Sequence, residues 1–200
     1  MTLNRDDESA GQSPDVPVVS LADFEGNGEA WGRPAWVVAA WLLAEWLFLT
    51  NSLQVSSRVR VSVLRRFGAN IGSNVIFRPR TRVKSPWKLT IGDDCWIGEG
   101  VWFHNQDEII VRNDCVISQD TFLTTGSHRH RDRMQLITSP ILVEEGVWIT
   151  ARCVITGGAV IGRSALISPM SVVKGRVPAN AVVSGQPSVV VGSRFNLAPE

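Results

Sequence analysis

Apolar residues recur at every sixth position along much of the chain. The longest unbroken run is Val143, Ile149, Ile155, Ile161, Ile167 and Val173. Because six is a multiple of two, residues at this spacing point to the same face of extended chain. Small side chains lie two positions before these residues, at Cys153, Ala159, Ala165 and Ser171. This pattern is the hexapeptide period of a parallel β-helix and does not fit an amphipathic α-helix.

The same spacing recurs upstream in sets of three, each of which predicts one three-sided coil. These sets are Ile71–Phe77–Val83, Ile91–Ile97–Phe103 and Val111–Ile117–Leu123. The steps between sets are eight, eight and then twenty residues, so all three insertions fall at one corner of the coil. We therefore predict an all-β repeat fold over residues 69–195, a parallel β-helix of about five coils with an inserted loop at 124–142.

A tryptophan-rich segment precedes the repeats, and residues 31–68 are predicted to be helical. The stretch "PAWVVAAWLLAEWLFLTN" has a helix start at Pro34 and an end at Asn51. Its apolar run is shorter than the roughly 20 residues that span a bilayer. Two interpretations remain open. The helix could cap the end of the β-helix, or residues 35–66 could contact a membrane surface through tryptophans and the acid-free basic stretch 51–88.

The composition excludes some classes of partner. A net charge of +1 with 20% charged residues gives no indication of nucleic-acid binding. Residues 1–30 are acidic and poor in apolar residues, which favours a disordered tail. No secretory signal is recognisable, so a cytoplasmic protein with reduced cysteines is expected. Cys95, Cys115 and Cys153 each lie two residues before an inward position and are predicted to be buried structural residues.

Candidate catalytic residues cluster at the corner that carries the insertions. His128 and His130 lie in the longest insertion, and His104 and Asn105 lie in the preceding one, so all three histidines are expected along one edge. Histidine ionises near neutral pH and suits a general base. A solvated loop histidine is the alternative for each. A zinc site is also conceivable, but His128 and His130 are only two residues apart and no metal site is predicted.

Residues 31–195 resemble the hexapeptide-repeat acyltransferases, in particular the colanic-acid biosynthesis acetyltransferases. The resemblance rests on "RRFGANIGSNV", "IGDDCWIGEGVWFHNQDEI", "ISQDTFLTTGSH", "PILVEEGVWI" and "VPANAVVSGQPS". It implies a left-handed β-helix that forms homotrimers with sites between subunits. It also implies acetyl transfer from acetyl-CoA to a sugar hydroxyl in surface-polysaccharide biosynthesis, without a metal.

The resemblance also implies roles for individual residues. His128 corresponds to the general base and Asn105 to an asparagine beside the acceptor. The implied substrate-binding residues are His104, Asp107, Ser127 and His130. The implied coenzyme-binding residues are Trp148, Ala151, Ser168, Lys174, Arg176, Gly185 and Pro187.

The coenzyme end departs from the family pattern. Basic residues of relatives are replaced by Gly175 and Val189, so Lys174, Arg176 or Arg194 would have to substitute. The alternative to an enzyme is a non-catalytic scaffold docked on a membrane or partner. Within the enzyme class, the acceptor could be a free sugar, a lipid-linked sugar, serine or an amino sugar.

Overall fold

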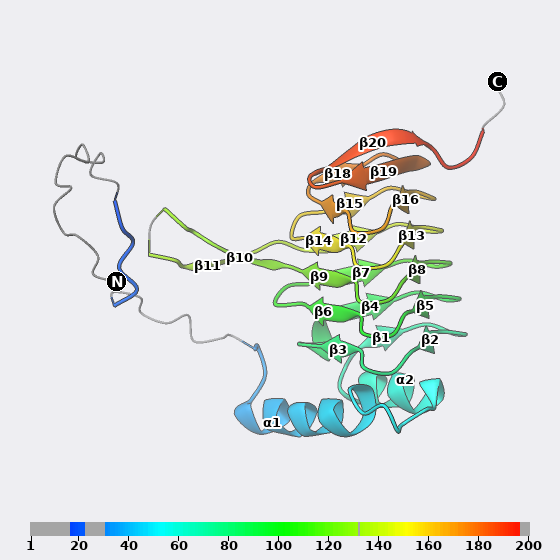
Figure 1. Ribbon diagram of the computed structural model, residues 1–200. Helices are drawn as coiled ribbons and strands as arrows, with labels where there is room; N and C mark the ends of the chain where they lie inside the picture. Colours follow the sequence, from blue (N-terminus) through cyan, green and yellow to red (C-terminus); the bar gives the residue numbers. More distant parts are fainter. Residues whose placement is uncertain (1–16, 23–30, 132, 197–200) are drawn as a thin grey trace, which may run out of the picture.

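The computed structural model describes residues 17–22, 31–131 and 133–196. It is a stack of β coils over a short helical base, with one hairpin projecting from the side (Figure 1). Residues 17–22 contain no helix or strand, and the rest of the predicted acidic tail lies outside the described residues. The architecture is the predicted left-handed parallel β-helix.

Three parallel sheets form the faces of the prism. The first face contains β1 (Asn70–Ile71), β4 (Leu89–Ile91), β7 (Ile109–Val111), β12 (Ile141–Val143), β15 (Val160–Ile161) and β18 (Arg176–Val177). The second contains β2 (Ile76–Phe77), β5 (Trp96–Ile97), β8 (Val116–Ile117), β13 (Trp148–Ile149), β16 (Leu166–Ile167) and β19 (Ala181–Gly185). The third contains β3 (Arg82–Val83), β6 (Trp102–His104), β9 (Phe122–Thr124), β14 (Val154–Thr156) and β17 (Val172–Val173).

The six-residue pattern identifies the core. Every residue marked by that spacing is buried, and strands of successive coils pair in register, as in Ile149 with Ile117 and Ile167. The structure adds a partial sixth coil, β18 and β19, to the five expected. Its inward residues Val177 and Val183 follow Val173 after a step of only four residues, which breaks the period.

Two of the three corners turn in the same way. The third residue after each inward aliphatic has a positive φ, as at Asn74, Asp94 and Asp114. Asn, Asp and Gly tolerate this left-handed conformation better than other residues, and Gly146 supplies it in the fourth coil. The corner between the third and first faces, here called the insertion corner, is irregular and carries all three insertions. The first of them contains a short 3₁₀ helix, η2 (Pro86–Lys88).

Helices cover the open end of the first coil, as the capping interpretation predicts. They are α1 (Ala35–Ala44), a π-helical turn η1 (Glu45–Leu49) and α2 (Ser57–Arg66). Trp41 is fully buried and its indole N–H donates to the carbonyl of Val83 in β3 at 2.9 Å. Oε1 of Glu45 accepts from the N–H of Val83 at 2.7 Å. No helix in the described part of the chain is long and apolar enough to cross a membrane.

The longest insertion forms a β-hairpin where a loop was expected. Strands β10 (Gly126–His128) and β11 (Leu136–Thr138) pair antiparallel, with His128 opposite Leu136. The strands are three residues long and mostly exposed, so they lack the alternation that would reveal them in the sequence. Figure 1 shows this hairpin reaching away from the coils.

Candidate active site

The hairpin fixes one tautomer of His128. Nδ1 of this exposed imidazole lies 2.6 Å from the carbonyl oxygen of Met134, on the returning side of the hairpin. A carbonyl oxygen only accepts, so Nδ1 carries a proton and donates it, and in the neutral ring the lone pair therefore lies on Nε2. Met134 has a φ of 53°, which belongs to the turn that presents this carbonyl. The geometry therefore leaves Nε2 able to accept a proton.

The root of the hairpin is tied to the preceding coil. Thr125 donates its backbone N–H to the carbonyl of His104 at 3.3 Å, and its hydroxyl accepts from the N–H of Asp107 at 2.8 Å. His104 lies opposite Thr124 in the sheet, with Nδ1 3.2 Å from the hydroxyl oxygen. The histidines thus share a corner only at the root of the hairpin. The hairpin carries His128, together with exposed Ser127 and His130, outward from the coils.

Asn105 is fully buried in the wall of the insertion corner. Its amide NH₂ donates to the carbonyl of Ser85 at 2.6 Å, and its carbonyl accepts from the Ser85 N–H at 2.9 Å. Both ends of the amide therefore hold the loop that leads into η2. In this arrangement Asn105 fixes the backbone next to His104.

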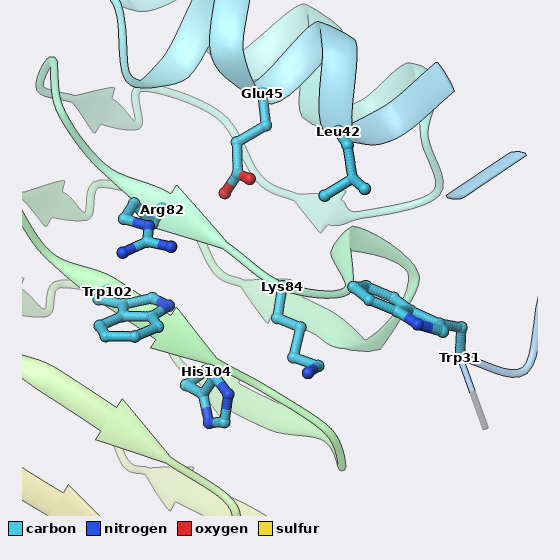
Figure 2. A pocket seen from close by; sticks show the side chains of 7 residues that line it. All are labelled: Trp31, Leu42, Glu45, Arg82, Lys84, Trp102 and His104. Carbon is cyan, nitrogen blue, oxygen red and sulfur yellow. The ribbon is translucent and has the colours of Figure 1, made fainter. Parts of the chain in front are cut away.

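A pocket of about 220 Å³, here called the cationic pocket, opens between α1 and the third face. Its lining residues are Trp31, Leu42, Glu45, Arg82, Lys84, Trp102 and His104. Figure 2 shows Arg82 between Glu45 and Trp102, with Lys84 pointing toward Trp31. Of the lining residues, the sequence identified only His104. The repeat spacing could have shown that Arg82 and Trp102 lie together, because they occupy paired positions in neighbouring coils.

The predicted coenzyme-binding residues lie in three places on one chain. Ala151 and Ser168 occupy the corner between the second and third faces in successive coils. Gly185, the last residue of β19, and Pro187, in the turn that follows, lie at the same corner. Lys174 and Arg176 are exposed at the insertion corner. Trp148 points outward from the second face, half-exposed, and donates its indole N–H to the hydroxyl of Ser118 at 3.0 Å. One chain does not bring these three groups together.

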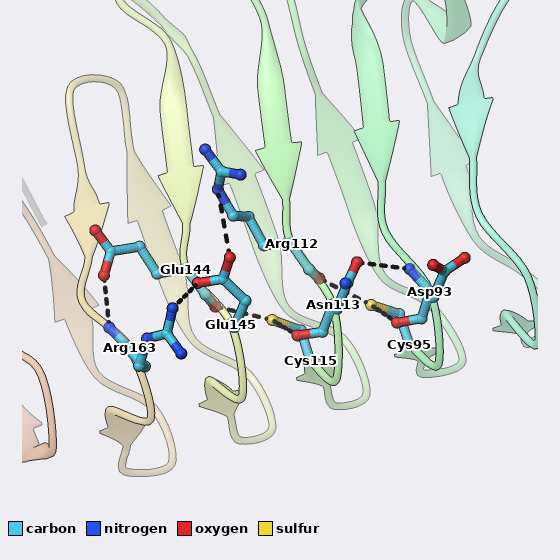
Figure 3. A network of polar contacts seen from close by, with 8 residues as sticks. All are labelled: Asp93, Cys95, Arg112, Asn113, Cys115, Glu144, Glu145 and Arg163. Carbon is cyan, nitrogen blue, oxygen red and sulfur yellow. Dashed lines mark hydrogen bonds and ion pairs between the residues drawn. The ribbon is translucent and has the colours of Figure 1, made fainter.

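The cysteines belong to the core, as predicted. All three are buried and free, and Cys95 and Cys115 each donate a thiol hydrogen bond to a carbonyl of the next coil at 3.0 Å (Figure 3). Interaction with the thiol of the neighbouring coil is the main influence on both; it raises the pKa of Cys115, as burial also does, and lowers that of Cys95. Among the described residues no group of three or more His, Cys, Asp and Glu could hold a metal ion.

Comparison with known proteins decides the family. No family model matches the sequence. The Escherichia coli protein named as colanic acid biosynthesis acetyltransferase WcaF is 40% identical over 144 residues, which make up 72% of this chain and 79% of that protein. The chain belongs to the hexapeptide-repeat acetyltransferases of the colanic acid type.

A more distant relative and a solved structure agree with this assignment. The E. coli lipopolysaccharide biosynthesis O-acetyl transferase WbbJ is 24% identical over 116 residues, or 52% of this chain and 59% of that protein. A hexapeptide-repeat acetyltransferase from Vibrio cholerae, solved with acetyl coenzyme A, has a TM-score of 0.70 at 26% identity and covers 79% of this chain and 86% of that one. The protein is an acetyl-CoA-dependent acyltransferase, and the enzyme interpretation is favoured over a scaffold.

Proposed function

We propose that this acetyltransferase moves the acetyl group of acetyl-CoA to a sugar hydroxyl in surface-polysaccharide biosynthesis, with His128 as general base. Nε2 takes the proton of the acceptor hydroxyl as its oxygen attacks the thioester carbonyl. The carbon–sulfur bond breaks, and the imidazolium returns the proton to the departing CoA thiolate. The products are an acetyl ester and CoA, so no group on the protein is consumed.

The observation that carries this proposal is the hydrogen bond between His128 and Met134. It holds the imidazole as the tautomer whose Nε2 can accept a proton, which is the state a general base needs before reaction. The sugar acceptor and the polysaccharide context are supported by the names of the two E. coli relatives.

We further propose that the working form is a homotrimer with sites between subunits. The hairpin that carries His128 projects from its own coils, so a neighbouring copy is the natural surface for it to reach. His128 would then meet the acceptor beside His104 and Asp107, with Ser127 and His130 on the hairpin flanking it. Asn105 would act here by holding the loop at Ser85 in place.

The coenzyme site would also be shared. Ala151, Ser168 and the Gly185–Pro187 turn supply one corner, and Lys174 and Arg176 supply exposed cations at another. Packing two copies side by side would bring such separate groups against a single acetyl-CoA, with Trp148 beside the thioester. The cations would stand in for the basic residues replaced by Gly175 and Val189.

We also propose a peripheral contact with the inner face of the cytoplasmic membrane. The outer helix surface, defined as Trp36, Leu43, Trp46 and Leu47, is exposed on the side of α1 and η1 away from the coils. Exposed Arg33, Arg58 and Arg66 add positive charge to this end of the molecule. Tryptophans combined with arginines match an anionic lipid surface.

The test of the acetyl transfer is the substitution His128→Ala. We expect acetylation of acceptor sugars to fall by about 10²- to 10⁴-fold because the general base is lost. Turnover is measured as CoA release with a panel of free, nucleotide-linked and lipid-linked sugars, together with serine and an amino sugar. Arg129→Ala, exposed on the same hairpin and assigned no role in the site, is the matched control and should keep its activity. Light scattering should give the same trimer mass for both variants; undiminished turnover in His128→Ala would falsify the role of this base.

A further inference from the structure

A groove of about 630 Å³, here called the α2 groove, opens between α2 and the turn that joins β1 to β2. Helix α2 packs on these strands at the helical end of the stack (Figure 1). Val61 of α2 lines the groove on one side, and Val75 and Ile76 line it on the other. The latter two are only half-buried, so the groove presents apolar surface to solvent.

Two arginines of α2, Arg58 and Arg65, line the same groove. They are seven residues apart, which is about two helical turns or about 10 Å, so they lie on one side of the helix. The Arg65 guanidinium donates to the carbonyls of Ile71 at 3.0 Å and Gly72 at 2.6 Å. Arg58 makes no side-chain hydrogen bond within the described part of the chain, and neither arginine forms an ion pair there. Both therefore keep their positive charge at the groove.

The carboxylates that approach this turn are held by groups of the turn itself. Asp93 accepts from the N–H of Ser73 at 2.5 Å, and Asp94 accepts from the side-chain amide of Asn74 at 3.0 Å. Among the described residues, no carboxyl lines the groove. An anion in the groove would thus contact two guanidinium groups and no lining carboxylate.

Helix α2 as a whole also carries unbalanced positive charge. It contains four arginines and no acidic residue. One of them, Arg60, is fully buried and donates to the carbonyls of Phe77 and Gln54, while its Nε has no partner in the described chain. Burial, and to a lesser degree the charge of Arg78, lower the pKa of Arg60. A negative charge bound beside α2 would offset this repulsion.

Exposed apolar side chains lie next to the groove in the sequence. The segment that leads into α2 exposes Leu53 to 89% and Val55 to 84%, and Val59, beside Arg58 in the helix, is also exposed. Exposed apolar residues that occur together mark contact surfaces, and apolar residues beside arginines are typical of segments at a lipid interface. The outer helix surface lies at the same end of the stack, since η1 packs on α2. These features together favour a lipid as the occupant of the groove.

We propose that the α2 groove binds the headgroup phosphate of an anionic membrane phospholipid, with Arg58 and Arg65 as its ligands. An acyl chain lies along the apolar side of the groove, and Leu53 and Val55 enter the lipid layer. This inference rests on the proposed membrane contact and adds a discrete lipid site to it. Arginine forms paired, charge-assisted hydrogen bonds with phosphate oxygens. Ser62, which lines the groove between the two arginines, adds a hydroxyl donor.

The first experiment measures lipid binding without a bilayer. Dihexanoyl phosphatidylglycerol below its micelle-forming concentration, dihexanoyl phosphatidylcholine and glycerol 3-phosphate are titrated calorimetrically into the full-length protein. We expect the phosphatidylglycerol to bind most tightly. The choline group offsets the phosphate charge of the second probe, and the third probe has no acyl chains.

Arg58→Gln is the main variant, because Arg58 makes no side-chain hydrogen bond or ion pair in the described fold and its loss should leave folding intact. We expect it to weaken phosphatidylglycerol binding about tenfold or more, since a charge-assisted hydrogen bond to phosphate is lost. Arg65→Gln should act in the same direction, and Arg58→Lys should recover part of the affinity. Arg80→Gln is the matched control, because Arg80 pairs with Glu99 in the first coil, outside the groove, and should leave binding unchanged. The melting temperatures of Arg58→Gln and the control should agree.

Each probe can contradict the proposal. Failure of dihexanoyl phosphatidylglycerol to bind the unaltered protein would overturn it, as would equal binding of this lipid by Arg58→Gln and Arg80→Gln. If glycerol 3-phosphate bound as tightly as phosphatidylglycerol, the groove would be a site for free phosphate. If phosphatidylcholine did so, the site would be purely apolar. Either result would overturn the assignment of an anionic phospholipid.

The second experiment measures co-sedimentation with phosphatidylglycerol vesicles at low salt. The paired change Leu53→Ser with Val55→Ser should reduce it at least severalfold, and undiminished co-sedimentation would overturn the proposed orientation of the groove toward lipid. Val191→Ser, 59% exposed at the opposite end of the stack, is the control.

The two experiments separate the lipid site from the membrane contact. Co-sedimentation of the unaltered protein without binding of the monomeric lipid would refute the groove site and leave the membrane contact intact. Binding of the monomeric lipid that depends on Arg58, without co-sedimentation, would instead refute the membrane contact and leave the lipid site standing.

Discussion

At the scale of single residues, Glu45 joins the base of the molecule to the cationic pocket. Its carboxylate accepts from the backbone of β3 while its side chain lines the pocket, and it stands where α1 widens into a π-helical turn. Such turns are often found at functional sites. One side chain therefore serves both the attachment of the helix and the electrostatics of the pocket.

The raised pKa of Glu45 predicts a pH-dependent contribution to stability. Because burial raises the pKa above its usual value near 4.5, the folded protein binds this proton more tightly than the unfolded chain. The contribution is complete below about pH 4.5 and falls as pH rises through the folded pKa. Glu45→Gln keeps an acceptor for the Val83 N–H but removes the titration. We expect the free energy of unfolding of the unaltered protein to decrease relative to that of Glu45→Gln as pH rises above 4.5.

Urea unfolding of both proteins between pH 4.5 and 8 provides this comparison. The difference between their free energies of unfolding isolates Glu45, because the contributions of the other carboxyl groups are the same in both proteins and cancel. A difference that stays constant with pH, or that moves in favour of the unaltered protein as pH rises, would contradict the burial effect assigned to Glu45.

At the scale of elements, the hairpin depends on the coil above it for its position. The N–H of Ser139 donates to the carbonyl of Thr125 at 3.0 Å, closing the base of the hairpin. Gly157, after β14, lies against this closure. A Cβ added at Gly157 would stand 2.8 Å from the carbonyl oxygen of Thr125 and 3.1 Å from that of Ser139. Both contacts are with backbone atoms, so they can be relieved only by a shift of the chain.

We therefore predict that Gly157→Ala displaces the hairpin and with it His128. A displacement approaching 1 Å would reduce kcat by on the order of 10- to 100-fold. The measurement is kcat at saturating acetyl-CoA, with circular dichroism to verify folding. Gly192→Ala in β20 (Ser188–Ser193) is the control, because its added Cβ would meet nothing within 4 Å. Equal activity of the two variants would mean that the hairpin is not held through Gly157.

At the scale of the whole molecule, the two ends of the stack differ in character. The helical end exposes Trp36 and Trp46 to 74% and 66%, whereas the opposite end presents β20. If the helical end meets lipid, the paired change Trp36→Ser with Trp46→Ser should reduce co-sedimentation with phosphatidylglycerol vesicles at least severalfold. Val190→Ser, on β20 and 57% exposed, is the control at the far end and should bind like the unaltered protein.

The salt dependence of this binding gives a second measurement. Binding supported by Arg33, Arg58 and Arg66 should weaken as ionic strength rises. No co-sedimentation of the unaltered protein at low salt, or equal co-sedimentation of the paired variant, would rule out the membrane contact.

The sequence predicted the coils well because one rule generates them. Inward residues such as Ile97, Ile117 and Ile149 repeat with the coil, so an error at one would have shown at its neighbours. The same rule placed all insertions at one corner. The partial sixth coil was missed because the step from Val173 to Val177 breaks the period.

The site was less accessible to such reasoning. The hydrogen bond that orients His128 is made to the backbone carbonyl of Met134. Every residue has such a carbonyl, so the identity of residue 134 gives no indication of this bond. Trp31 and Leu42 join the pocket only through the way that the N-terminal segment folds against the third face. Asn105 was assigned to the acceptor from resemblance, whereas its buried bonds to Ser85 depend on three-dimensional packing.

The closed ends of the stack also govern how copies of this chain can associate. Sheets that run along a solenoid leave unpaired backbone groups at their terminal strands, and bare ends would let molecules join end to end into filaments. Here α2 packs on β1 and β2, and η1 packs on β3. At the other end, β20 turns back antiparallel on β19 and occupies the edge of the second face. Growth along the axis is thereby discouraged, and sideways association remains, the direction in which a projecting hairpin can reach another copy.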